Sequence, residues 1–254
     1  MIDISIISCL TDNYSYLIRD KETNIVGVID PSEFNPVDLQ IQKTYKKLDF
    51  ILNTHHHLDH VGGNTELKKK YNSKIVSSSL DEKRIPGIDI KKNDGDQFYL
   101  GKTEFKVINI PGHTIGHVAF FSQRTGVIFT GDTLFSLGCG KVFEGTIEQM
   151  FNSLQKISSL PKNTKIYCGH EYTIKNGEFC MSIDKSNTKL INRIQDSKNK
   201  FKKKIPSIPI TIGEELETNI FLRCDNKKIK KSLKMDNSSK LEVFTRLRSL
   251  KDNF

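Results

Sequence analysis

The residues with the clearest capacity for chemistry lie between Thr54 and His60, where the sequence reads Thr-His-His-His-Leu-Asp-His. An apolar stretch ends at Leu52 and a glycine pair follows at Gly62–Gly63, so the cluster lies where a buried strand ends and the chain turns. Histidines and a carboxylate packed this closely would be costly to bury without compensation. A metal ion gathers such groups, so the spacing predicts a metal site and not a solvated polar loop.

The remaining histidines agree with this prediction. The chain has seven histidines, and all of them fall in three short clusters: Thr54–His60, Pro111–His117 and Cys168–Tyr172. Asp132, within Gly131-Asp132-Thr133, follows another apolar run that ends at Phe129. Because α/β sheets bind ligands where their strands end, one sheet edge could bring these clusters together.

The spacing divides the candidate ligands into two sets. Alternate residues of an extended strand end, His55 and His57, point the same way and can bind one ion, whereas Asp59 and His60 follow the turn and can bind a second. Two oxygens allow Asp132 to bridge. The predicted ligands are therefore His55, His57, His113 and Asp132 for the first ion, and Asp59, His60, His170 and Asp132 for the second.

Nitrogen and carboxylate ligands without a thiolate suit zinc, iron or manganese, and we favour zinc. Two divalent ions about 3.5–4 Å apart lower the pKa of bound water from 15.7 towards ~7, which supplies a bridging hydroxide for attack on an acyl carbonyl. Asp132 would bridge the ions and Asp59 would orient the hydroxide, so both are predicted catalytic residues.

Other reactive side chains near these clusters are expected to have structural roles. His56 projects away from its neighbours and His117 opens a strand, so both are expected to form hydrogen bonds within the fold. Cys139 and Cys168 are expected to be small core residues, because a nucleophilic cysteine needs an activating base and the imidazoles are committed to metal.

These motifs together resemble the glyoxalase II (hydroxyacylglutathione hydrolase) branch of the metallo-β-lactamase superfamily. The histidine clusters carry the resemblance to the superfamily, and the loop Gly138-Cys139-Gly140-Lys141 and the C-terminal Arg248 and Lys251 carry the resemblance to the branch. It implies hydrolysis of S-D-lactoylglutathione and related 2-hydroxyacyl glutathione thioesters, the second step of methylglyoxal detoxification. The implied fold is α/β, a metallo-β-lactamase αββα sandwich followed by a smaller C-terminal helical domain.

The resemblance also implies a substrate site. Arg248 and Lys251 would hold the glycine carboxylate of glutathione, and Lys141 and Tyr172 would contact the same moiety. Phe143 departs from the family, which commonly has tyrosine there, so a hydroxyl that could hydrogen-bond glutathione is missing. We expect weaker binding at that contact without loss of the chemistry.

Two other functions remain open at this point. A mononuclear iron glutathione persulfide dioxygenase of the same superfamily would need a single ion, against which the complete second ligand set argues. A nuclease resembling RNase Z is suggested only by the basic C-terminal third.

The elements that must position these residues follow from hydrophobic periodicity. Strands are predicted at 2–9, 14–19, 24–29, 49–53, 74–77, 97–100, 104–109, 117–122, 126–130 and 164–168, and helices at 36–47, 64–71, 146–157, 173–182, 187–203 and 239–250. The glycines of 136–145 predict a flexible loop. Strands nearly vanish after Tyr172, so we predict a metal domain at 1–174 and a helical domain at 175–254 that contributes the glutathione site.

Charge and cysteine content limit the classes of binding partner and the cellular compartment that we expect. Residues 185–254 contain 18 Lys and Arg against 8 Asp and Glu, but the lysine runs Lys202–Lys204 and Lys227–Lys228 lack interleaved aromatic residues. A solvated basic face is therefore favoured over a nucleic-acid site, and it could steer an anionic substrate. Five scattered cysteines without a Cys-x-x-Cys pair, and an N-terminus without a signal pattern, predict a cytoplasmic protein. We expect no membrane partner and a monomer.

Overall fold

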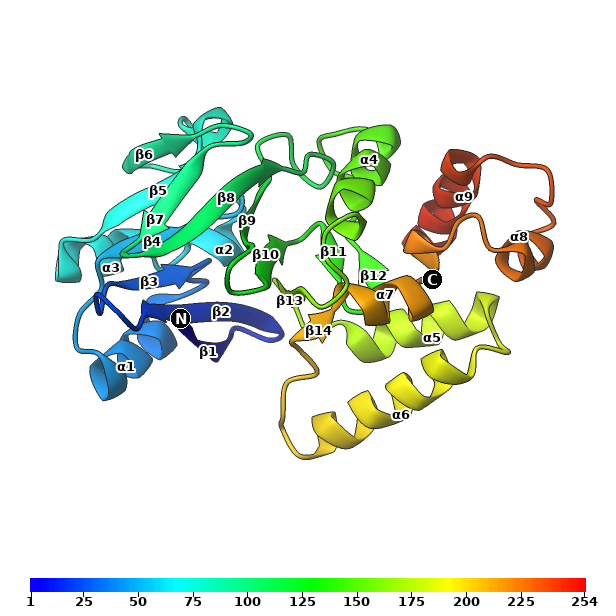
Figure 1. Ribbon diagram of the computed structural model, residues 1–254, viewed down its shortest axis with the longest axis horizontal. Helices are drawn as coiled ribbons and strands as arrows, with labels where there is room; N and C mark the ends of the chain where they lie inside the picture. The colour runs from blue at the N-terminus through cyan, green and yellow to red at the C-terminus, as the bar shows by residue number, and fades with distance from the viewer.

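Two six-stranded sheets pack face to face in the computed structural model, which describes residues 1–254 (Figure 1). In spatial order the first sheet contains β1 (Ile2–Cys9), β2 (Asn13–Asp20), β3 (Val26–Ile29), β4 (Phe50–Leu52), β5 (Lys74–Ser78) and β6 (Ile88–Lys92). Its first three strands are antiparallel neighbours, whereas β3 to β6 run parallel. Parallel neighbours need crossover connections, which contain α1 (Phe34–Thr44) before β4, α2 (Leu58–Val61) and α3 (Asn64–Tyr71) before β5, and the short 3₁₀ helix η1 (Ser79–Asp81) before β6.

The second sheet combines hairpins with one parallel pair. Its spatial order is β14 (Ile210–Thr211), β13 (Lys165–Cys168), β10 (Val127–Gly131), β9 (Val118–Ser122), β8 (Thr103–Asn109) and β7 (Gln97–Leu100). Only β10 and β13 are parallel, and α4 (Ile147–Ser158) lies in the connection between them. A small hairpin of β11 (Leu134–Phe135) and β12 (Gly138–Cys139) precedes α4.

Helix α4 shows how the local sequence specifies its element. The Thr146 hydroxyl accepts a hydrogen bond from the backbone N–H of Gln149, and the Gln149 side-chain oxygen accepts one from the backbone N–H of Thr146, so a reciprocal capping box begins the helix. Met150, Leu154 and Ile157 recur at helical spacing and are all buried. The helix therefore presents one apolar stripe to the second sheet.

Three apolar clusters hold the layers together. Side chains such as Ile18, Phe105 and Phe129 fill the space between the sheets. Val37 and Leu67 belong to a second cluster, which fastens α1 and α3 to the outer face of the first sheet. These layers of helix, sheet, sheet and helix are the predicted sandwich.

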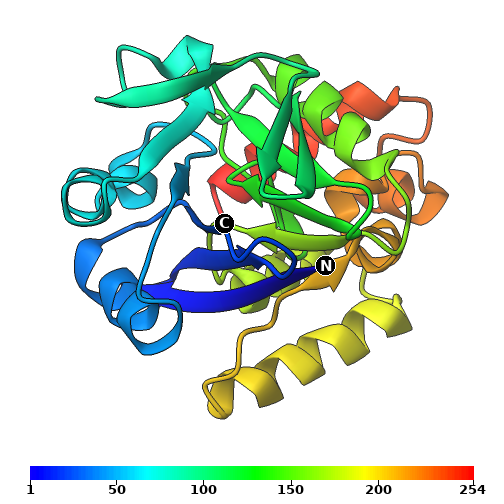
Figure 2. The same ribbon diagram turned by 60° about the vertical axis from the view of Figure 1, so that its left-hand side comes forward.

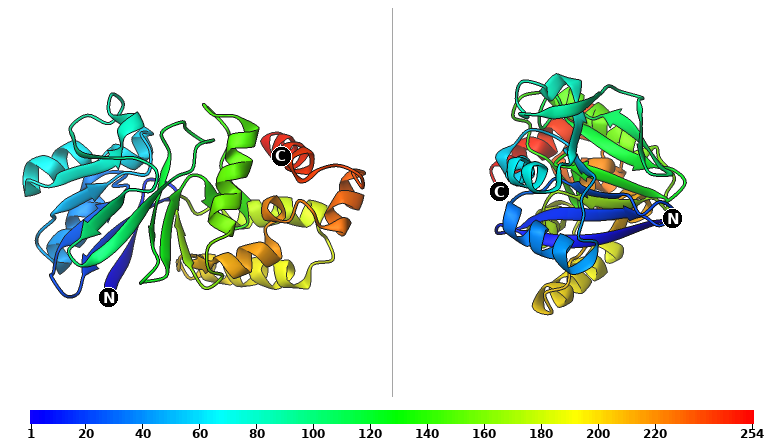
Figure 3. Two further views of the ribbon diagram at one scale, coloured as in Figure 1. Left: turned by 45° about the horizontal axis from the view of Figure 1, so that its top comes forward. Right: turned by 90° about the vertical axis from the view of Figure 1, so that its left-hand side faces the viewer.

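The C-terminal third packs on the outer face of the second sheet. It contains α5 (Thr173–Ile183), α6 (Thr188–Lys202), α7 (Ile212–Thr218), the short 3₁₀ helix η2 (Ile220–Leu222), α8 (Lys227–Leu233) and α9 (Lys240–Asp252). These helices gather beside α4, at the right of Figure 1 and of the left view in Figure 3. Figure 2 shows α6 along the lower edge of the molecule. One apolar cluster unites Ile128 and Ile166 of the sheet with Phe244 and Leu247 of α9.

Several details differ from the sequence prediction, which did not include β6, α7 or α8. Residues 136–140 are buried and include β12, so the predicted flexible loop is wrong in this part. A Cβ on Gly140 would lie 1.9 Å from the carbonyl oxygen of Asp132, so this glycine permits close packing against the chain itself. The C-terminal third also adds β14 to the second sheet, and strands this short lack a clear period. The boundary at residue 174 stays a prediction.

No helix combines the length and the apolar composition that a membrane crossing would require.

Candidate metal centre

All seven predicted ligands converge at one edge of the two sheets. His55 and His57 lie between β4 and α2, which itself contains Asp59 and His60. The other three residues, His113, Asp132 and His170, follow β8, β10 and β13 respectively. Gly169 makes the approach of β13 possible, because a Cβ there would lie 2.2 Å from Oδ1 of Asp132. Strand ends far apart in the sequence thus meet at one place, as the spacing predicts.

The first group consists of three imidazoles. Nδ1 of His57 lies 3.2 Å from Nε2 of His55 and 3.0 Å from Nε2 of His113. Three nitrogens converging at this separation can serve as ligands of a single ion, since all lie within 4.8 Å of one another.

The second group contains Asp59, His60 and His170. Oδ2 of Asp59 lies 3.7 Å from Nε2 of His60 and 3.4 Å from Nε2 of His170. Asp132 faces both groups, because its Oδ1 lies 3.3 Å from Nε2 of His60 and its Oδ2 lies 3.5 Å from Nε2 of His113. Asp132 is thus placed to contact an ion in either group.

Two atoms at the centre show that a cation fits. Nε2 of His60 and Oδ1 of Asp132 are buried and have no hydrogen-bond partner in the protein. Buried polar atoms are normally paired, so this exception needs an explanation. A nitrogen and an oxygen left free at the junction of two ligand groups are the donor atoms that a divalent metal requires.

The outer nitrogen of four histidines is held by another part of the chain. Such contacts fix ring orientation in metal sites. The partners are Thr54 Oγ1 for His55 at 3.0 Å, Asp30 Oδ2 for His60 at 3.0 Å, the Lys141 carbonyl for His113 at 2.8 Å and Asp12 Oδ1 for His170 at 2.8 Å.

Asn13 was missed as a site residue by sequence reasoning. Its side-chain amide donates to Oδ2 of Asp59 at 3.0 Å and to the carbonyl oxygen of Asp59 at 3.1 Å. Asn13 follows Asp12, the partner of His170, so the turn between β1 and β2 supports the second group from outside. No local pattern distinguishes this turn from an ordinary one.

Asp30 forms another candidate ligand set with His55 and His60, but its oxygens are engaged elsewhere. Its Oδ1 accepts from the backbone N–H of Thr54 at 2.7 Å, and its Oδ2 accepts from the hydroxyl of Thr54 at 2.6 Å. Asp30 therefore positions the ligand loop.

His56 and His117 lie outside both groups. Nε2 of His117 accepts a hydrogen bond from the backbone N–H of Asp132 at 3.1 Å, and its ring stacks on that of His55. His56 points towards Glu144, with 3.4 Å between its Nε2 and Oε1 of that carboxylate. Both therefore interact within the fold.

The two ligand groups differ in the pKa values of their histidines. Burial lowers the pKa of His55, His57 and His113 below 6.5, so these imidazoles are neutral near pH 7. Burial acts in the same direction on His60 and His170, but the carboxylate of Asp132 outweighs it and raises both pKa values, that of His170 to about 10. Without metal, the second group therefore holds protons at neutral pH.

Metal binding should consequently release protons from the second group. A ligand histidine must be neutral, so loading this group at about pH 7 is expected to displace about two protons per chain, while the first group releases almost none. Because both pKa values are raised, affinity at the second group should weaken as pH falls from about 10. Calorimetric titration in two buffers of different ionisation enthalpy measures the release. Equal enthalpies in both buffers at both steps would contradict this prediction.

Comparisons with known proteins agree with the geometry. Residues 10–170 match the family model of the metallo-β-lactamase superfamily, and residues 171–254 match that of the hydroxyacylglutathione hydrolase C-terminus. The chain is 52% identical over 252 residues to the hydroxyacylglutathione hydrolase of Pelagibacter ubique, covering 99% of this chain and 100% of that protein. The chain belongs to the hydroxyacylglutathione hydrolase family.

Solved structures agree with the fold. ETHE1 from Myxococcus xanthus superposes with a TM-score of 0.67 at 22% identity and covers 98% of this chain and 96% of its own. The protein TTHA1623, crystallised in a di-iron-bound form, has a TM-score of 0.55 at 26% identity and covers 66% of this chain and 91% of its own. The predicted fold class and the predicted family are confirmed.

Residues assigned to glutathione by family resemblance lie in two places. Phe143 is 61% exposed and its ring contacts those of His57 and His113, with centroids 5.9 and 5.2 Å apart. The ammonium of Lys141 lies over the ring of Phe143, and Tyr172 stacks on His170. These three residues therefore border the metal centre directly.

The two C-terminal cations differ in their surroundings. Arg248 is buried, and its guanidinium donates to the carbonyl of Cys139 at 2.8 Å and to Asp252 at 3.0 Å. Lys251 is half-buried between the rings of Phe179 and Phe254 and has no carboxylate within 4.0 Å. Lys251 is therefore the freer cation, while Arg248 also fastens α9 to β12.

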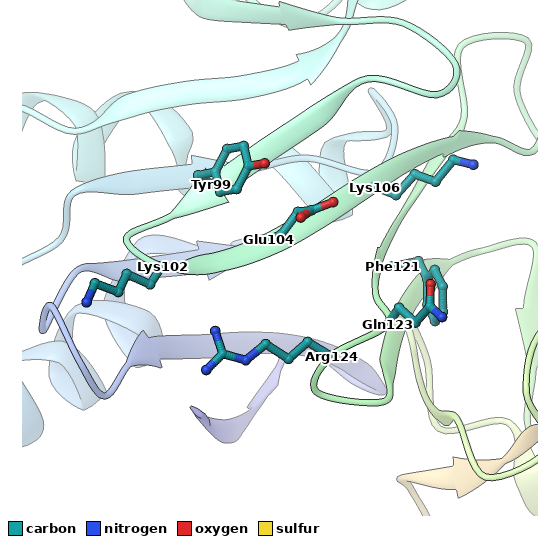
Figure 4. A pocket seen from close by; sticks show the side chains of 7 residues that line it. All are labelled: Tyr99, Lys102, Glu104, Lys106, Phe121, Gln123 and Arg124. Carbon is teal, nitrogen blue, oxygen red and sulfur yellow. The ribbon is translucent and has the colours of Figure 1, made fainter.

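A surface hollow of about 450 Å³ lies elsewhere, on the outer face of β7 to β9 (Figure 4). Its lining residues are Tyr99, Lys102, Glu104, Lys106, Phe121, Gln123 and Arg124. Lys102 and Arg124 both pair with Glu22, at 3.5 and 3.2 Å. None of these residues belongs to the metal centre, and we assign the hollow no role in catalysis.

Proposed function

We propose that the protein hydrolyses S-D-lactoylglutathione and related 2-hydroxyacyl glutathione thioesters to glutathione and a 2-hydroxy acid. Two complete ligand groups joined by Asp132 carry this proposal, in a chain 52% identical over its length to a protein named for that activity. Thiolate is a good leaving group, so the reaction needs little acid assistance when the thioester carbon–sulfur bond breaks.

Two divalent ions per chain are part of the proposal, held by the seven residues assigned above. The di-iron form of TTHA1623 supports a two-ion centre in a protein of related structure, and zinc, iron and manganese all suit the donor atoms. When bound, the ions supply Lewis-acid chemistry, lowering the pKa of water and polarising the thioester carbonyl.

Asp59 and Asp132 have separate parts in this proposal. Burial alone would raise the pKa of Asp59, but the hydrogen bond from His170 lowers it, so the carboxylate is ionised at neutral pH. The side chain of Asp59 is 38% exposed, which leaves it able to accept a hydrogen bond from the attacking water. Asp132 is buried and would link the two ligand groups by contacting an ion in each.

The substrate site would be shared between the two predicted domains. Residues 1–174 would contribute the metal centre with Lys141 and Tyr172, and residues 175–254 would contribute Arg248 and Lys251. The glycine carboxylate of glutathione would pair with Lys251, because that ammonium has no carboxylate partner in the protein. A basic C-terminal third would also attract a substrate with two carboxylates.

Phe143 offers a gain-of-binding test. Substituting Phe143→Tyr restores a hydroxyl at an exposed ring beside the metal centre, and one new hydrogen bond is worth about 0.5–1.5 kcal/mol. We expect KM for S-D-lactoylglutathione to fall by about 2- to 10-fold with kcat unchanged. Phe201→Tyr, at an equally exposed ring at the end of α6, is the matched control and should change neither constant. A KM that rises or stays constant in Phe143→Tyr would remove this contact from the site.

Hydrolysis itself is tested by following loss of thioester absorbance with the purified, metal-analysed protein. Hydrolysis together with two ions per chain is the expected result. Failure to hydrolyse any glutathione thioester, or one iron per chain with oxygen uptake on glutathione persulfide, would overturn the proposal. The cytoplasmic location, the monomeric state and the absence of a nucleic-acid partner stay predictions.

A further inference from the structure

Arg84 joins two carboxylates that lie 63 positions apart in the sequence. Its Nη1 donates to both oxygens of Glu144 at 2.7 Å, and its Nε donates to Oδ1 of Asp81 at 3.0 Å. No other arginine or lysine lies within 4.0 Å of either carboxylate. The side chain of Asp81 is fully buried, whereas those of Arg84 and Glu144 are 32% and 27% exposed.

Glu144 connects this ion pair to the loops of the metal centre. It directly follows Phe143, and the backbone N–H groups of both residues donate to the carbonyl of His113 at 3.3 Å. Oε2 of Glu144 also accepts from the backbone N–H of Ile115 at 2.9 Å, within the loop that carries His113. Arg84 thereby secures the segment that presents Lys141 and Phe143.

The charges make Arg84 necessary for this arrangement. Asp81 and Glu144 both approach His56, so two carboxylates converge on one small volume. The guanidinium neutralises them by directing separate N–H donors to the two carboxylates at once, which a single ammonium group cannot reproduce. Without Arg84, Glu144 would be released towards solvent, because Asp81 is buried and cannot move away.

Three ligand histidines have supports outside residues 141–145, whereas Nδ1 of His113 lies 2.8 Å from the carbonyl of Lys141 within that segment. Thr54, Asp30 and Asp12 hold His55, His60 and His170, and none of these contacts involves Arg84. Loss of Arg84 should therefore disturb the segment that borders the substrate and, through His113, weaken the first ligand group, while the second group keeps its supports.

We propose that Arg84 is a positioning residue for substrate binding: through Glu144 it holds residues 141–145 in the conformation that receives the thiol half of the thioester. This inference rests on the proposed function. Arg84 acts through Glu144 and touches no reacting atom.

The kinetic test compares two thioesters. In Arg84→Gln, KM for S-D-lactoylglutathione should rise by roughly 10- to 100-fold, the scale of effect expected from a misplaced binding group. With metal in excess, its kcat should stay close to wild type. A lactoyl thioester of a small uncharged thiol should be hydrolysed as by wild type, because it does not use the loop. Arg84→Lys should recover part of the loss, and Glu144→Gln should raise KM to a similar extent.

Arg124→Gln is the control, because Arg124 forms an exposed ion pair with Glu22 far from these loops. The double substitution Arg84→Gln with Glu144→Gln should be no worse than either single one, since both break the same link. Equal losses on both thioesters with metal in excess would overturn the proposal.

A second measurement does not depend on the substrate. Amide hydrogen exchange of residues 141–145 should accelerate in Arg84→Gln and in Glu144→Gln, while the strands keep wild-type protection. Unchanged exchange in this segment would overturn the role of Arg84 even if the wild type hydrolyses no glutathione thioester. Failure of the proposed function would instead appear as an inactive wild type, with the exchange result still decisive for Arg84.

Discussion

Substituting Asp132→Asn is expected to lower kcat by roughly 10³-fold or more and to reduce the number of bound metal ions. The carboxylate of Asp132 faces both ligand groups, with its two oxygens 3.3 Å from His60 and 3.5 Å from His113. Asparagine keeps the volume but places an NH₂ donor, which cannot bind metal, against one group. Metal Lewis-acid catalysis supplies several kcal/mol of transition-state stabilisation, which corresponds to this loss in rate.

The measurement combines steady-state kinetics with elemental analysis of the same preparation. Asp236→Asn is the matched control, because Asp236 is exposed and forms no ion pair, and it should leave both quantities unchanged. Circular dichroism should show that the protein with the Asp132→Asn substitution keeps its fold. If that protein retained two ions and a tenth of the wild-type kcat, Asp132 would be excluded as the bridge.

The convergence of the seven candidate ligands could be predicted from sequence because the spacing of four of them is local. His55, His57, Asp59 and His60 fall within six positions, so a strand end and the first turn of a helix suffice to place them. The remaining ligands each follow an apolar run, and a strand that must end at the sheet edge delivers them there. Periodicity also predicted most elements, including α4.

Contacts that cross between elements could not be predicted. Arg84 and Glu144 lie 60 positions apart, and nothing in either segment specifies the other until the order of the strands is known. Asp30 and Thr54 meet because β3 and β4 are parallel neighbours, with Ile29 opposite Leu52. Gly138 and Gly140 were misinterpreted because their packing partners, Asn176 and Asp132, are known only from the fold. Tight packing and flexibility both favour glycine, so the sequence does not distinguish them.

Substituting Asp30→Ala should weaken both the fold and the metal centre. Asp30 is 2% exposed, and its carboxylate accepts from the N–H and the hydroxyl of Thr54 and lies 3.0 Å from Nδ1 of His60. Leaving a buried donor unpaired costs ~1–3 kcal/mol, so the free energy of unfolding of the metal-free protein should fall by about 3 kcal/mol or more. Because His60 would lose the partner that orients its ring, metal affinity should fall by about 10- to 100-fold.

The substitution Asp20→Ala is the control that distinguishes the effect on stability from the effect on metal binding. Its carboxylate is also fully buried and accepts from the backbone N–H groups of Glu22 and Lys102, but at the far end of β2 from the metal centre. Urea unfolding of the metal-free proteins should show that Asp20→Ala and Asp30→Ala are both destabilised, whereas competition with a chelator should show weaker metal binding only in Asp30→Ala. If the two variants retained the same metal affinity, Asp30 would contribute to the sheet alone, and the orientation of His60 would have to come from the backbone of α2.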